Sequence, residues 1–386
     1  MIHPNPVHHH FHMHRIREMT ALYWTNSLRA IATCLVAVLI PVYLSNIGYS
    51  LPEILLVFVA EGLLWLLILY PATVAAHKFG ANKLMVFATI MLLGVMMSLA
   101  LLPSYEWLIF SVIFFKALSS LYWLSFRLNF TAVTNGQEAG GKIGLTNALF
   151  LASMGIAPAV GGIVAEIYGI EWTYAVAIIT ILLACIPLME TAEIKKWPRP
   201  KLSKLNIKRI FPDLIANGGS TIDDSTGALI WPLLIFIIVP TYAGVGLLSA
   251  LVVVSAILIS LWVGWRESKK GERHYLKQGS FIMSVTNFLR FLTQTVSHIA
   301  SINLLAGIGQ ALYTTPLASR YYKNASREPT IEYIFAMQVI SALAWALYPL
   351  ILFGLTFILS DKEVLIVGAL LAIPATWAIR FMRTST

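Results

Sequence analysis

The sequence predicts an all-α integral membrane protein with twelve transmembrane helices in two pseudo-symmetric six-helix halves. Of its 386 residues, 58% are hydrophobic and only 12% are charged, whereas a soluble globular protein carries about 25% charged residues. The apolar residues form long blocks, and about 20 consecutive apolar residues cross the hydrocarbon core as a helix. Because lipid offers the backbone no hydrogen bonds, each block must satisfy its own as a helix. A basic segment in the middle of the chain separates two sets of six blocks.

Each block defines one expected span. The spans of the first half are 21–46, 52–76, 83–103, 106–132, 141–168 and 172–190, and those of the second half are 212–239, 242–265, 277–297, 299–321, 331–359 and 363–381. The chain then divides into a His-rich tail (1–20), a first bundle (21–190), a basic linker (191–211) and a second bundle (212–386). The least marked boundary lies between spans nine and ten, near 297–301, where no charged loop separates them.

The distribution of positive charge predicts the orientation. Most of the 27 lysines and arginines fall in alternate connections and in the central linker, as expected for cytoplasmic loops of a membrane protein. We therefore expect a multi-pass protein of a bacterial inner membrane, with both termini in the cytoplasm. The net charge of +9 follows from this topology, so nucleic acid is not an expected partner and the lipid bilayer is.

Two short segments with related spacing follow the second span of each half. The first reads Thr73-x3-His77-x2-Gly80-x2-Lys83, and the second reads Gly264-x3-Ser268-x2-Gly271-x-Arg273. Glycine suits a tight turn between helices, and the basic residues suit a position near anionic lipid headgroups.

The fifth span contains a motif rich in small residues around a proline. It reads Ser153-Met154-Gly155-Ile156-Ala157-Pro158-Ala159-Val160-Gly161-Gly162. Pro158 removes a helix hydrogen bond and bends the span, and Gly155, Gly161 and Gly162 allow close helix contact. Such packing also occurs in other membrane bundles.

These segments resemble motifs of the major facilitator superfamily. The loops are similar to its Gly-x3-Asp-x2-Gly-x-Arg/Lys motif, with His77 and Ser268 at the Asp position. Span five is similar to its Gly-x3-Gly-Pro-x2-Gly-Gly motif, with Ser153 in place of the first glycine. The resemblance implies secondary active transport by alternating access, with the loops as cytoplasmic gates. The family associates the span-five motif with antiporters, which favours export.

Among the charged residues within the expected spans, five are the candidate site residues: Arg29, Glu61, Lys116, Asp223 and Asp224. A charge at the bilayer centre costs about 2.5–3.5 kcal/mol on insertion scales, so each is expected to face protein or water. In the resembled fold, spans one, four, seven and ten line a central cavity. Arg29, Lys116 and the Asp pair would then share one space and form a substrate or proton pathway. The alternative is a set of structural ion pairs, and Glu61 suits either role.

The expected function is therefore a permease that moves a small polar or amphiphilic solute, coupled to a proton or ion. No nucleotide-binding loop of the Gly-x4-Gly-Lys-Ser/Thr kind is present, so ATP is not the expected energy source. We expect no cofactor, and we do not expect an enzyme. One alternative is an integral-membrane enzyme acting on a lipid-like substrate, with Asp223 and Asp224 as its reactive cluster.

A second alternative is a divalent-metal exporter. Histidines crowd the first fourteen residues at positions 3, 8, 9, 10, 12 and 14, and histidine clusters bind transition metals. The spans do not supply a matching set of His and Cys ligands. We therefore expect no metal site, and we interpret the tail as a disordered segment.

Overall fold

The computed structural model describes residues 6–101, 105–134, 155–189 and 196–384, and over these ranges it contains helices and no strand. The helices of the first half are α1 (Pro6–Val36), α2 (Ile40–Asn46), α3 (Leu51–Phe79), α4 (Ala81–Leu101), α5 (Tyr105–Ser119), α6 (Leu121–Thr134), an unlabelled helix (Gly155–Tyr168) and α8 (Ile170–Met189). Those of the second half are α9 (Ile207–Ser225), a π-helix η2 (Thr226–Ile230), α10 (Trp231–Ile238), α11 (Tyr242–Lys270), α12 (Glu272–Phe291), α13 (Val296–Arg327), α14 (Thr330–Leu355) and α15 (Asp361–Ala378). Short 3-10 turns, η1 (Leu202–Lys204) and η3 (Ile379–Phe381), precede α9 and follow α15.

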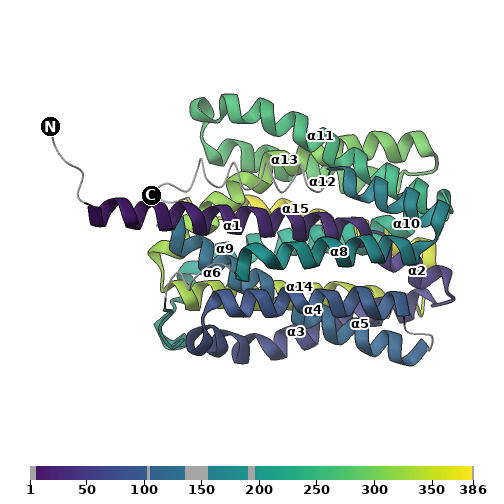
Figure 1. Cartoon of the computed structure of the whole chain (residues 1–386). Helices are drawn as coiled ribbons and strands as arrows, with labels where there is room; N and C mark the ends of the chain where they lie inside the picture. The colour runs from purple at the N-terminus through teal and green to yellow at the C-terminus, as the bar shows by residue number, and fades with distance from the viewer. Residues whose placement is uncertain (1–5, 102–104, 135–154, 190–195, 385–386) are drawn as a thin grey trace.

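The helices lie lengthwise beside one another, with α3, α4 and α5 on one side of the bundle and α11, α12 and α13 on the opposite side (Figure 1). Within the described residues, nine helical segments are long and apolar enough to cross a membrane. The shorter Gly155–Tyr168 helix and the more polar α12 and α13 occupy the three remaining expected spans. The protein is thus an all-α multi-pass membrane protein.

Two expected spans are interrupted helices. The fourth span breaks at Ser120 between α5 and α6, where Ser119 and Ser120 both donate side-chain hydrogen bonds to the Lys116 carbonyl. Such back-bonding by serine bends helices. The seventh span contains the π-helix η2, which begins two residues after Asp224. A π-helix inside an α-helix is rare and often marks a functional site.

Two helix boundaries differ from the sequence-based expectation. The break between spans nine and ten falls at 292–295, several residues earlier than predicted, because the Thr295 side chain accepts from the His298 amide and caps α13. Helix α1 begins at Pro6, so its backbone is helical through most of the His-rich tail that we expected to be disordered. Proline is well tolerated in the first helical turn.

Two helix pairs bring the backbones of the two halves close together. In the first, α3 packs against α14 so closely that a Cβ on Gly62 would meet Ala346 at 2.8 Å. In the second, the Gly155–Tyr168 helix packs against α11, where a Cβ on Gly162 would collide with the Tyr242 carbonyl. Small residues permit such backbone contact inside a membrane.

Candidate functional site

Asp223 lies at the centre of a buried polar network within the second half. Tyr313 Oη on α13 donates to Asp223 Oδ2 at 2.8 Å, and Asn287 Nδ2 on α12 lies 3.5 Å from Oδ1. Arg290 Nη1 donates to Asn287 Oδ1 at 2.7 Å, and its guanidinium interacts electrostatically with Asp223. The same guanidinium lies 4.8 Å from the Trp231 ring centroid. The Asp223 carboxylate is therefore anchored by one hydroxyl, one amide and one cation.

Asp224 faces a different environment from its neighbour. Its side chain is exposed, whereas Asp223 is only 6% exposed, because successive helical residues point about 100° apart. Asp224 interacts electrostatically with Asp223 and with Arg127 on α6 of the first half. Arg127 Nη1 also donates to Tyr321 Oη on α13 at 3.3 Å, and its guanidinium lies 4.6 Å from that ring. Arg127 thus connects the two halves beside an accessible carboxylate.

Lys116 and Glu61 form an ion pair within the first half. Lys116 Nζ lies 2.8 Å from Glu61 Oε2, with side-chain exposures of 20% and 4%. The ammonium also lies 4.0 Å from the Phe58 ring centroid and 5.6 Å from that of Trp345 on α14. This pair borders the α3–α14 interface, next to Gly62. The structure therefore brings Lys116 to Glu61 and the interface, and not into the Asp223 network.

Arg29 binds backbone oxygens. Its Nη2 donates to the Ser119 carbonyl at 3.0 Å, its Nη1 to the Ala88 carbonyl at 3.5 Å, and its guanidinium lies 4.3 Å from the Tyr122 ring centroid. Arg29 is 7% exposed. Its partners lie on α4, α5 and α6, so Arg29 joins helices of the first half and, like Lys116, is placed apart from the Asp pair.

The loop segments form matching turns in the two halves. Gly80 ends α3 with φ +96°, and Gly271 precedes α12 with φ +76°, a backbone region that favours glycine. His77 Nδ1 lies 2.6 Å from the Trp197 carbonyl of the linker. Lys83 and Arg273 are exposed. Gly264 lies within α11.

The glycines of span five contact helices from both halves. A Cβ on Gly161 would collide with the Leu35 carbonyl of α1, and one on Gly155 would meet Ile257 of α11 at 3.2 Å. The Pro158 carbonyl leaves no room for a Cβ on Gly246 of α11. Glu166, one turn beyond the motif, accepts from the Tyr242 amide at 2.9 Å. The motif helix is thus a close-packed link between the halves.

Three participants were not among the predicted site residues: Arg127, Arg290 and Tyr313. Arg290 lies inside the expected ninth span, 277–297, but was not chosen as a site residue. Arg127 lies near the end of the expected fourth span, and α6 continues past it to Thr134. Tyrosine carries no charge signal in a sequence. A search for hydrogen-bond donors within the spans, at the same expected membrane depth as the Asp pair, would have included Tyr313.

No group of three His, Cys, Asp or Glu side chains comes together as a metal site among the residues whose side chains are described. The tail histidines lie outside that set. Both cysteines, Cys34 and Cys185, are buried free thiols.

Together, the helical bundle, the glycine contacts between halves and the buried charges define a multi-pass membrane transporter. A family model described as the Major Facilitator Superfamily matches residues 22–349, and the chain belongs to this family. Among solved structures it is similar to that of the human organic anion transporter MFSD10 (TETRAN), with a TM-score of 0.69 and 12% identity over 95% of this chain and 99% of the other. At that identity the likeness shows the fold alone. No curated protein matches the sequence.

Proposed function

We propose that the protein is a proton-coupled secondary transporter that exchanges protons for a small polar or amphiphilic solute. The observation that carries this proposal is the accessible Asp224 carboxylate, which interacts with Arg127 across the boundary between the halves. An ionisable residue within a membrane span is a functional-site hypothesis by default. In transporters built from two halves, the solute binds between them near the midplane.

Protonation of Asp224 changes what holds the two halves together. The ionised carboxylate attracts Arg127 and accepts hydrogen bonds from a solute. The protonated acid no longer attracts Arg127 and is a weaker acceptor with one oxygen occupied by the proton, so a proton and a hydrogen-bond-donating solute compete for the same oxygens. Such competition is the basis of exchange, because each ligand leaves before the other binds. The π-helix that begins two residues after Asp224 gives this span an irregular backbone, on which the site can change shape.

The Asp223 carboxylate is a fixed neighbour of the Asp224 carboxylate, whose protonation state changes during exchange. Its hydroxyl, amide and guanidinium partners hold Asp223 in place. Two adjacent carboxylates repel when both are ionised. The fixed Asp223 therefore leaves Asp224 as the member of the pair that is free to exchange its partners.

The basic linker and the paired glycine turns support an orientation with both termini in the cytoplasm. His77 binds the linker backbone at Trp197, and the Lys201 amide donates to Glu332 on α14 at 2.9 Å. The linker therefore contacts both halves at one end of the bundle. We assign this end to the cytoplasmic side of a bacterial inner membrane, and the turns at Gly80 and Gly271 to the gate.

Proton flux in proteoliposomes tests the proposal. The reconstituted protein, with a pH dye inside the vesicles, is exposed to a library of amines, sugars, amino acids, organic anions and drugs under an imposed pH gradient. We expect at least one solute to drive proton movement with the wild type and none to do so with Asp224→Asn. Asp361→Asn removes an exposed carboxylate at the start of α15 and serves as the matched control, which should behave as the wild type. Solute-driven proton flux that persists in Asp224→Asn contradicts the proposal.

A further inference from the structure

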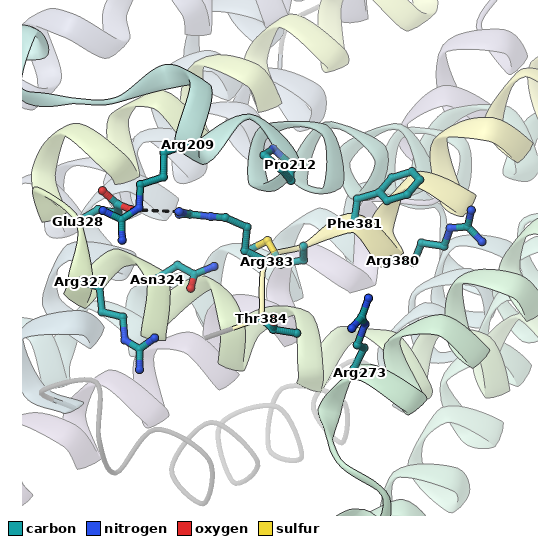
Figure 2. A pocket seen from close by; sticks show the side chains of 11 residues that line it. Arg209, Pro212, Arg273, Asn324, Arg327, Glu328, Arg380, Phe381, Arg383 and Thr384 are labelled. Atoms are coloured by element: carbon teal, nitrogen blue, oxygen red, sulfur yellow. Dashed lines mark hydrogen bonds and ion pairs between the residues drawn. The ribbon is translucent and has the colours of Figure 1, made fainter. Parts of the chain in front are cut away.

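A cavity rich in arginine lies at the end of the second half where the chain ends. Its volume is about 470 Å³, within the range of small-ligand pockets. It opens between the start of α9, the start of α12, the end of α13 and the residues after α15 (Figure 2). Its charged lining consists of Arg209, Arg273, Arg327, Arg380, Arg383 and Glu328.

One side of this cavity is a closed ionic framework. Asp213, fully buried, accepts from the Arg383 amide, Nε and Nη2 at 2.9, 2.9 and 2.7 Å. Glu328 pairs with both Arg209 and Arg383 at 3.1 Å. Burial lowers the pKa of Arg383, but its bonds to Asp213 and Glu328 outweigh this effect, so its pKa lies above the ordinary value. Two carboxylates thus balance two arginines, and the framework holds the chain end in place.

The other side of the cavity has no such balance. In the part of the chain that the structure describes, no carboxylate forms an ion pair with Arg273 or Arg380. Arg273 is exposed and faces the like charge of Arg320, whose own carboxylate partner is Glu272. Arg380 lies over the rings of Trp377 and Phe381, at 3.8 and 5.0 Å from their centroids. Figure 2 shows Arg273 and Arg380 on the side of the cavity away from the Arg209–Glu328–Arg383 framework.

Neutral donors complete the lining. Asn324 is anchored through Nδ2 to Asp213 at 3.2 Å, and Thr384 is exposed at the chain end. Arginine presents planar N–H pairs that match two oxygens of a phosphate at once. Two arginines without a carboxylate partner, beside a framework that fixes the cavity wall, therefore offer donors that suit the oxygens of a phosphate group.

We propose that this cavity binds a phosphate-bearing anion at the end of the bundle, separately from the transported solute. Its position at the membrane boundary admits two sources with the same chemistry: the headgroup of an anionic phospholipid and a soluble phosphate compound. In either case the bound phosphate joins α12 to the chain end after α15. The site would therefore stabilise the second half while leaving Asp224 untouched.

Thermal unfolding of the purified full chain in detergent tests this inference with two probes. One series adds pyrophosphate, and the other adds phosphatidylglycerol, with phosphatidylcholine and sodium chloride of matched ionic strength as controls. A ligand that binds the folded state raises the unfolding temperature in a saturable way. We expect such a rise with one or both probes. Loss of two charge-assisted contacts should weaken binding at least about tenfold in Arg273→Gln/Arg380→Gln.

The matched control is Lys78→Gln/Lys83→Gln, which removes two exposed positive charges around the Gly80 turn of the first half and should keep wild-type affinity. A response to phosphatidylglycerol alone identifies a lipid headgroup, and a response to pyrophosphate alone identifies a soluble ligand. Should the double variant unfold, Arg273→Gln alone, at an exposed position without an ion pair, provides the test. The proposal is overturned if neither probe acts beyond the salt control, or if binding survives loss of both arginines.

Discussion

Helix α9 carries two carboxylates about three turns apart that have opposite environments. Asp213 is fully buried and receives three hydrogen bonds from Arg383, one from Tyr333 at 2.9 Å and one from Asn324. Asp224 is exposed, and the charges that act on it are Asp223 and Arg127. A carboxylate whose oxygens are all occupied has one stable state. A carboxylate with an accessible oxygen and a single cationic neighbour can exchange its interaction with that cation for a proton or a solute.

The comparison predicts its largest effect on stability at Asp213. Removing one member of a buried ion pair leaves an uncompensated charge, which costs about 3–5 kcal/mol. Asp213→Asn keeps the shape but leaves Arg383 without its main partner, so we expect a large fall in unfolding temperature or in the yield of folded protein. Asp361→Asn, which removes an exposed carboxylate, should unfold like the wild type. An unchanged unfolding temperature for Asp213→Asn would mean that the framework contributes little to folding.

Glu61 and Lys116 form an intermediate case, in which a buried carboxylate meets a partly exposed cation. Glu61→Gln should destabilise the protein by about 1–3 kcal/mol, because Lys116 loses its partner. Glu61→Gln/Lys116→Met should recover much of this loss, since replacing both members of a buried pair is often nearly neutral.

The measurement is unfolding temperature in the same detergent for the single and double variants. If the pair is structural, transport by the double variant should also persist. Lost transport with restored stability would assign Lys116 or Glu61 to the substrate pathway, as the sequence first suggested.

Much of the architecture could be predicted from the sequence because it depends on local composition. Runs of apolar residues fix the spans, and the basic linker between the sixth and seventh divides the halves. The family prediction was confirmed by the family model that matches residues 22–349. It could be made from the sequence because the motifs around Gly80, Gly162 and Gly271 depend on local backbone geometry. The break between α12 and α13 was misplaced because its signal is one capping residue, Thr295.

The partners of the charged residues could not be predicted, because partner choice depends on helix rotation and depth. Arg29 and Lys116 were expected beside the Asp pair because spans one, four and seven line the central cavity of the resembled fold. In the structure Arg29 binds backbone carbonyls and Lys116 binds Glu61. The cations that do act on Asp223 and Asp224, Arg290 and Arg127, lie on helices whose inward faces the apolar pattern does not identify. The order of the spans limits which helices can be neighbours. Which charged residues form pairs depends on how the side chains of those helices are oriented.

The smallest expected effect on stability lies at Asp224 itself. Because its carboxylate is accessible and makes no described hydrogen bond, Asp224→Asn should change the free energy of unfolding by no more than about 0.5 kcal/mol. Asp223→Asn, which weakens a buried network with Tyr313 and Arg290, should cost more. The unfolding temperatures of the two variants, measured side by side, distinguish the contribution of Asp223 to stability from that of Asp224. If Asp224→Asn proves as destabilising as Asp213→Asn, then Asp224 is a structural charge, and loss of proton flux in that variant would no longer indicate a coupling site.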